Sequence, residues 1–344
     1  MVASMETILA YKSSLELWSH LAGLNCSPYP YALDRAVTSG GNSGERDRGG
    51  KEKGKPRRDG ADAAYWLERA PFFTAPLHIA VDKAAKRRRG ERCVSHVVRQ
   101  LGNKGTVWGV GASLATVSPA MCLAQYAAEL PLAQLSELAC ALSGNYCFAA
   151  KPDGVVTSAI PLTSLRDMSA FLRAHQQIYG ASQTLRAVDL AIDGLGSPYE
   201  TVLYLLLCLP RKLGGYGFPK PLANSPIAPN ARESRVVAQR QFYPDLLWPE
   251  KRLVVEYDSS EHHCSPDQVE RDARRRNDME SMGYRVAAAN RSIITSERLF
   301  AHFADNVRRS LGLKSRKEMA HCKEARAQLR KLLLAPNSVA ELWR

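Results

Sequence analysis

The pattern of apolar and polar positions that organises the chain lies between Tyr243 and His263. Two apolar runs flank a short polar turn that contains Pro249, and this pattern predicts a β-hairpin. We place Asp245 at the end of the first strand. Glu256 and Asp258 lie two residues apart on the second strand, so their side chains are expected on the same face of the sheet.

The rest of the chain shows both helical and strand-like spacing of its apolar residues. Ser-Pro pairs at 118–119 and 197–198 are typical helix starts, because Ser caps the helix and Pro suits its first position. Gly283 is typical of a helix end. We expect helices over 1–24, 63–70, 120–129, 132–142, 162–175, 181–193, 198–207, 267–282, 296–311 and 314–334. We expect strands over 77–81, 93–98, 105–110, 224–227, 234–247, 253–258 and 284–289.

The helix that starts at Ser197 contains an acid at an unusual place. From Val202 to Leu207 it is wholly apolar, which is typical of a buried helix. Glu200 lies in its first turn. This residue either makes an ordinary contact with the helix dipole or adds another acid to those of the hairpin.

Composition divides the chain into segments. Residues 38–62 consist mainly of Gly, Ser and charged residues and offer no large apolar side chain to bury, so they predict a disordered linker. We expect an N-terminal helical segment over 1–37, this linker over 38–62, an α+β domain over 63–193, a second domain over 194–313 and a basic C-terminal helix over 314–344.

Charge and cysteine usage narrow the class of protein. The 344 residues carry a formal net charge of +13, which favours a polyanionic partner such as nucleic acid. Eight scattered cysteines without a C-x-x-C pair argue against a zinc ribbon or a disulfide framework and suit a reducing cytosol. The sequence shows no signal-peptide pattern and no apolar run long enough to span a bilayer. We therefore expect a cytoplasmic protein with no membrane partner.

The acids of the hairpin have two interpretations. They either face water on an edge hairpin or lie partly buried, where carboxylates cost several kcal/mol each unless a cation neutralises them. Carboxylate oxygens are ligands that Mg²⁺ and Mn²⁺ prefer. The sequence therefore predicts a divalent metal site beside the second strand.

The C-terminal half resembles a known type of nuclease. The segments YPDLLWP (243–249), LVVEYD (253–258), HH (262–263), DARRR (272–276) and GYRV (283–286) resemble, in order and spacing, a very-short-patch-repair-type endonuclease domain of the PD-(D/E)XK superfamily. The resemblance covers residues 197–313. It implies a restriction-endonuclease-like α/β fold in the C-terminal domain, with a mixed central sheet flanked by helices. The upstream α+β region resembles parts of AbiEi-type antitoxins, although no helix-turn-helix is visible at its N-terminus.

This resemblance implies a Mg²⁺- or Mn²⁺-dependent DNA endonuclease with no small-molecule cofactor. The metal ligands it implies are four acids: Asp245, Glu256, Asp258 and Glu200. Asp258 stands where most members of the superfamily have a lysine, so the general base is left open. His262 and His263 either act as acid, base or charge stabiliser near the phosphate or form a surface pair in a loop.

Two groups of cations are candidates for contacts with the phosphate backbone. Arg271 and Arg275 lie one helical turn apart and, with Arg274, belong to the basic helix after the hairpin. The run Lys86, Arg87 and Arg88 either follows a phosphate backbone or forms a solvated turn.

Two further functions remain open beside the nuclease. A non-catalytic DNA-binding or antitoxin-like regulator would retain the nuclease fold without its activity. A protein-interaction module is the third interpretation, and no motif favours it specifically.

Overall fold

The computed structural model describes residues 7–23, 61–110, 114–148, 155–157, 160–258, 266–315 and 319–334. These residues form a mixed α/β protein that divides into two compact units. The first unit falls within residues 1–130 and 147–185, and the second within 131–146 and 186–339. The second unit thus takes in residues 131–146 from the region expected to form the N-terminal domain. Residues 38–60 of the predicted linker lie outside the described residues.

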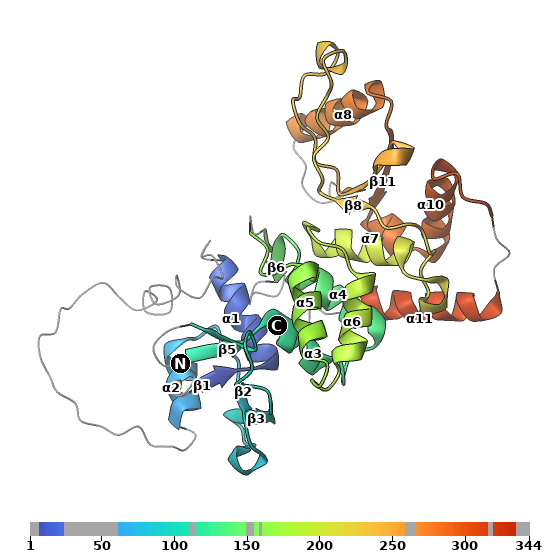
Figure 1. Ribbon diagram of the computed structural model, residues 1–344. Coiled ribbons are helices and arrows are strands. Elements are labelled where there is room, and N and C mark those ends of the chain that lie inside the picture. Colours follow the sequence, from blue (N-terminus) through green and yellow to red (C-terminus); the bar gives the residue numbers. More distant parts are fainter. Residues whose placement is uncertain are drawn as a thin grey trace, which may run out of the picture. The chain divides into compact units, whose positions relative to one another are not determined.

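A mixed five-stranded sheet lies in the first unit (Figure 1), in the order β3-β2-β1-β5-β4. β1 pairs parallel with β5 and antiparallel with β2. Leu9, Leu77 and Leu114 are buried at its centre. The strands are β1 (Thr7–Leu9), β2 (Leu77–Val81), β3 (Cys93–Val97), β4 (Val107–Gly109) and β5 (Leu114–Val117), and a separate two-stranded sheet pairs β6 (Tyr146–Phe148) with β7 (Val155–Thr157).

The helix predicted over residues 1–24 is wrong at its start. Thr7–Leu9 form strand β1, and helix α1 (Tyr11–Gly23) begins only after it. β1 has hydrogen-bonded neighbours on both sides, so pairing with residues distant in sequence overrides the local helical spacing. Strand β5, which supplies one of those neighbours, was not expected from the sequence.

The first Ser-Pro helix start is confirmed. Ser118 Oγ accepts a hydrogen bond from the Met121 backbone N–H at 3.4 Å, and Pro119 is the first residue of its helix. The helices of this unit are α1, α2 (Ala61–Arg69), α3 (Pro119–Tyr126) and α5 (Leu165–Ala174). Helix α6 (Ala181–Leu190) contains the point at which the chain passes to the second unit for the second time.

The second unit is built on a mixed sheet in the order β11-β10-β9-β8. β10 pairs parallel with β11 and antiparallel with β9, so the predicted mixed sheet is confirmed. Leu247 and Val254 pack with Met279 of the following helix on one face, and Tyr257 stacks on Tyr199 of another helix on the opposite face. The strands are β8 (Leu222–Ala223), β9 (Leu246–Trp248), β10 (Leu253–Asp258) and β11 (Arg285–Asn290).

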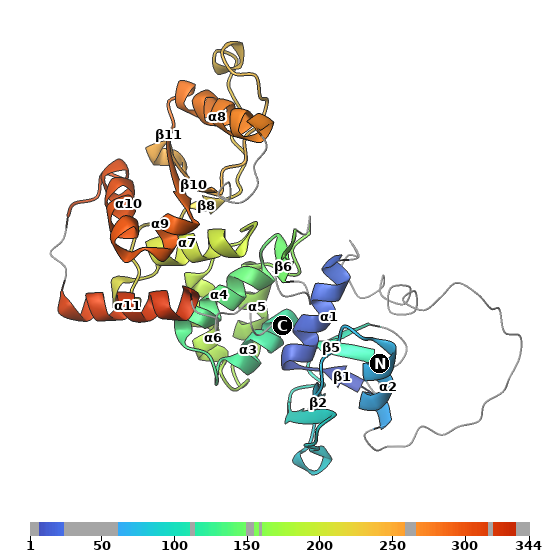
Figure 2. The ribbon, with the colours of Figure 1, turned by 180° about the vertical axis from the view of Figure 1, so that it is seen from behind.

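Helices cover this sheet on both faces, and Figures 1 and 2 show α8 and α10 on different sides of β11. Gly283 ends α8 with φ +82°, as its C-cap position predicts. The C-terminal helix docks through Leu329 and Leu333, which are both buried. The helices are α4 (Leu132–Leu142), α7 (Pro198–Cys208), α8 (Pro266–Ser281), α9 (Arg291–Thr295), α10 (Glu297–Ser310) and α11 (Ala320–Leu334). No helix in the described ranges is long and apolar enough to cross a membrane.

The strands predicted over 224–227 and 234–247 are largely absent. Between the end of β8 at Ala223 and the start of β9 at Leu246, the chain has only an isolated bridge between Ile227 and Phe242 and a 3₁₀ turn over Glu233–Arg235. Pro226 and Pro229 lack the backbone N–H that a strand ladder needs, which interrupts regular pairing here.

The apolar helix α7 should carry a large share of the stability of the second unit. We expect Leu203→Ala to lower the free energy of unfolding by about 2–5 kcal/mol, because this fully buried side chain would leave a cavity. Urea unfolding followed by circular dichroism measures the change. The matched control is Leu299→Ala, whose exposed side chain should cost less than about 1 kcal/mol. Equal losses from the two variants would contradict this view of the core.

Candidate functional site

The hairpin brings the first two candidate acids next to each other. β9 and β10 pair with Leu246 opposite Val255, and a 3₁₀ turn over Pro249–Lys251 joins them. Asp245 directly precedes β9, which corrects the prediction that it ends the first strand. Because the strands are antiparallel, the start of β9 lies at the end of β10, and Asp245 meets Glu256 there.

Asp245 has an unfavourable position for a charged carboxylate. Its Oδ2 accepts a hydrogen bond from the Tyr257 backbone N–H at 2.7 Å. Burial and the neighbouring Glu200 carboxylate nevertheless raise the pKa of Asp245 to about 8, and Glu256 adds to the rise. The side chain therefore tends to hold a proton at neutral pH unless a cation lies beside it.

Glu200 both contacts the start of its helix and adds an acid beside those of the hairpin. The second Ser-Pro start is confirmed, because Ser197 Oγ accepts a hydrogen bond from the Glu200 N–H at 3.2 Å. The Glu200 Oε2 accepts hydrogen bonds from the Gly196 N–H at 2.7 Å and from Asn224 Nδ2 at 3.0 Å. It thus stabilises the start of α7, and its charge also acts on Asp245.

Glu256 has a cationic partner already. Its Oε1 lies 2.9 Å from an Nη of Arg275, which extends from α8, and 14% of the Glu256 side chain is exposed. Burial raises the pKa of Glu256, while Arg275 and Arg276 oppose the rise. Asp258 is two residues further along the same strand and acts on Glu256 as a like charge.

The group is thus a set of acids whose mutual repulsion is only partly offset. Its donor chemistry fits Mg²⁺ or Mn²⁺ in kind, since the oxygens are carboxylate oxygens and Asp245 is short of positive charge. Among the described residues, however, no three His, Cys, Asp or Glu side chains are placed to hold a metal ion. Glu256 in particular would have to exchange Arg275 for the metal.

The arginines of α8 differ in what they contact. Arg275 donates to the Tyr243 carbonyl oxygen at 2.7 Å besides pairing with Glu256, so it is engaged with the hairpin. Arg274 pairs with Glu270 at 2.8 Å on the helix surface, and Arg271 is exposed. The prediction that Arg271 and Arg275 face a phosphate together therefore needs Arg275 to leave its partners.

Two features of the site were missed from the sequence. Asn224 contacts Glu200 from the irregular segment before the hairpin, where no motif marks it. Tyr199 and Tyr257 stack with their ring centroids 4.7 Å apart and their planes 5° from parallel. The alternation along β10 gave a signal for the second feature, because it places Tyr257 on the face opposite Glu256.

The remaining candidates belong to other parts of the chain. His262 and His263 lie outside the described ranges. The basic run at 86–88 is exposed in the first unit, where Lys86 pairs with Asp82 at 2.7 Å.

Comparison with known proteins gives no match to a family model, a curated protein or a solved structure. A function for this chain therefore has to follow from the side chains described above.

Proposed function

We propose that the second unit is a metal-dependent DNA endonuclease whose site contains Asp245, Glu256, Glu200 and Asp258. The observation that carries this proposal is the burial of Asp245 beside the Glu200 and Glu256 carboxylates, which together raise the pKa of Asp245 to about 8. Carboxylates cost free energy when they are gathered and desolvated, so such a group favours a cationic ligand. The resemblance to very-short-patch-repair-type nucleases supports the same function.

Asp245 and Glu256 would hold a Mg²⁺ or Mn²⁺ ion, with Glu200 and Asp258 completing or orienting the set. When bound, such an ion supplies positive charge at the phosphoryl oxygens and makes a water more acidic. Glu200 is held in place by Gly196 and Asn224, which would limit its movement during the reaction.

The chain's own cations would bind and orient the DNA. Arg271 and Arg274 are on the exposed surface of α8, the helix whose Arg275 reaches the carboxylates. A phosphate near Glu256 would attract the Arg275 guanidinium, which binds phosphate as readily as carboxylate. Exchange of Arg275 from Glu256 to the phosphate would release the Glu256 carboxylate as a ligand.

The second candidate function is a DNA-binding protein that does not cleave. The specific observation in its favour is the ion pair between Arg275 and Glu256, which supplies internally some of the positive charge that a metal would bring. In that case the carboxylates would serve to position α8.

A plasmid-nicking assay tests the proposal. We expect the wild-type chain to nick supercoiled DNA with Mg²⁺ or Mn²⁺, and we expect EDTA to stop the reaction. Asp245→Ala should lower the rate about a hundredfold or more, the effect typical of losing a group that stabilises charge at a reacting centre. Asp189→Ala, which removes an exposed carboxylate of α6, should keep the wild-type rate. DNA binding without cleavage in either metal would favour the second candidate.

A further inference from the structure

A cavity in the same unit shares no residue with the carboxylate group. It has a volume of about 720 Å³, a size suited to a small organic ligand. Three parts of the chain form its walls: the turn after α7, helix α10 with the segment that follows it, and α11. The lining residues on which the inference depends are Arg211, Tyr216, Phe218, Asp305, Arg308 and Arg326.

This cavity is positively charged, and its single lining acid is already engaged. Arg211, Arg308, Lys314 and Arg326 line it, against Asp305 alone. Arg308 binds Asp305 Oδ1 through Nε at 3.0 Å and an Nη at 2.8 Å, and its other Nη donates to the Leu313 carbonyl at 2.7 Å. Asp305 is therefore not available to neutralise Arg211. No described residue accepts a hydrogen bond or an ion pair from the Arg211 guanidinium.

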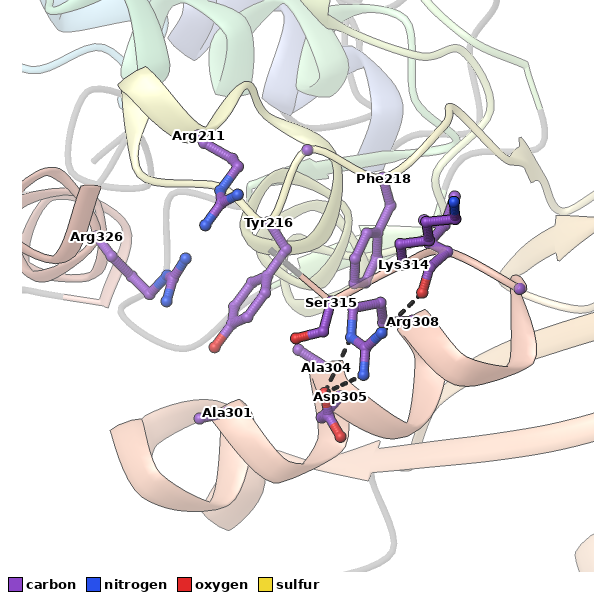
Figure 3. A pocket seen from close by; sticks show the side chains of 13 residues that line it. Arg211, Tyr216, Phe218, Ala301, Ala304, Asp305, Arg308, Lys314, Ser315 and Arg326 are labelled. Atoms are coloured by element: carbon purple, nitrogen blue, oxygen red, sulfur yellow. Dashed lines mark hydrogen bonds and ion pairs between the residues drawn. The ribbon is translucent and has the colours of Figure 1, made fainter. Parts of the chain in front are cut away.

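The aromatic wall orients the deepest cation. The Arg326 guanidinium carbon lies 3.9 Å from the centre of the Tyr216 ring, and only 9% of this arginine is exposed. Figure 3 shows Arg211 and Arg326 approaching the same side of Tyr216 from two different elements. Stacking restricts the guanidinium plane and so prepares it to donate in a fixed direction.

The backbone fixes the turn that carries Arg211. Gly214 has φ +95°, and a Cβ there would lie 2.3 Å from the Ala325 carbonyl oxygen of α11. Only glycine allows this close approach, which holds the turn after Arg211 against the helix that carries Arg326. The two arginines therefore belong to one packed structure.

We propose that this pocket binds a phosphate monoester of nucleotide size. A doubly charged phosphate offers three acceptor oxygens to the guanidinium groups, and the volume leaves room for a base beside Tyr216 and Phe218. The phosphate would come either from a free nucleotide or from the 5′ end of a DNA strand. The proposal stands apart from the proposed nuclease activity, because it uses none of the carboxylates.

Calorimetric titration of the full chain with AMP, adenosine, and a short single strand with or without a 5′ phosphate tests this assignment. We expect AMP to bind at least about tenfold more tightly than adenosine, because a charge-assisted contact is lost without the phosphate. If the phosphorylated strand binds more tightly than both AMP and the unphosphorylated strand, the phosphate comes from a DNA end. If AMP binds at least as tightly as the phosphorylated strand, the phosphate comes from a free nucleotide.

Matched variants locate the binding. Arg211→Gln should weaken AMP binding about tenfold or more, whereas Arg298→Gln, which removes an exposed arginine of α10 outside the pocket, should leave it unchanged. Circular dichroism establishes that both variants are folded. Equal affinities for AMP and adenosine, or equal losses in the two variants, would overturn the assignment.

Discussion

Glu256→Gln is expected to abolish plasmid cleavage while DNA binding is kept or strengthened. The substitution removes one negative charge beside the DNA and nearly preserves volume, so repulsion of the phosphate backbone falls. It also releases Arg275, now 2.9 Å from the Glu256 carboxylate, to bind phosphate. The nicking rate should fall about a hundredfold or more, the effect typical of removing a charge-stabilising group. Gel-shift affinity at low salt should equal that of the wild type or exceed it by up to about tenfold.

The matched control is Glu250→Gln, which makes the same change in the exposed turn of the same hairpin. This variant should cleave at the wild-type rate. A Glu256→Gln protein that still cleaves would remove Glu256 from the proposed site. Wild-type protein that neither cleaves nor binds DNA at low salt would leave the interaction-module interpretation in place of both DNA-based functions.

The parts of the fold that were predicted correctly are those fixed by local chemistry. Ser118 and Ser197 each cap a helix in which proline is the first residue, and Gly283 ends another. The hairpin is likewise encoded by its own two apolar runs and the polar turn between them. Strand β1 was mistaken for helix because its secondary structure depends on pairing with β2 and β5. The spacing of Ile8 and Leu9 gives no information about that pairing.

The candidate site shows the same division. Two of its acids, Glu256 and Asp258, were placed correctly on one strand, where residues two positions apart share a face. The sequence did not reveal that Arg275 pairs with Glu256 or that Asn224 holds Glu200, since each contact joins elements distant in the chain. The basic pocket was missed for the same reason: Arg211 and Arg326 are 115 positions apart and meet only through folding.

The pKa of Asp245 gives a prediction on stability that does not need enzymatic activity. In the folded chain, burial and Glu200 raise this pKa to about 8, from an ordinary value of 3.8. A group whose pKa is raised by folding stabilises the folded state below its unfolded pKa and loses that effect as the pH rises through the folded value. Without metal, the free energy of unfolding should therefore decrease between about pH 4 and pH 8.

Asp245→Asn should remove this decrease, because asparagine carries no charge at any pH in the range. At pH 8 in EDTA, we expect the variant to be more stable than the wild type by roughly 2–4 kcal/mol, given about 1.4 kcal/mol for each pKa unit and some relaxation around the charge. At pH 4 the two proteins should be nearly equal. Urea unfolding at both pH values, followed by circular dichroism, measures the difference.

Two controls test whether the stability change of Asp245→Asn is specific: the addition of Mg²⁺ and a second variant expected to lose stability. Mg²⁺ at pH 8 should stabilise the wild type more than Asp245→Asn, because the ion offsets the charge that the variant lacks. Asp305→Asn should act in the opposite direction, since Arg308 lowers the pKa of Asp305 and its charge favours the folded state at neutral pH. If Asp245→Asn is instead less stable than the wild type at pH 8, Asp245 is a favourable anion in the folded chain. The cluster of Asp245, Glu200 and Glu256 would then not require a cation, and the proposal of a metal site would no longer be supported.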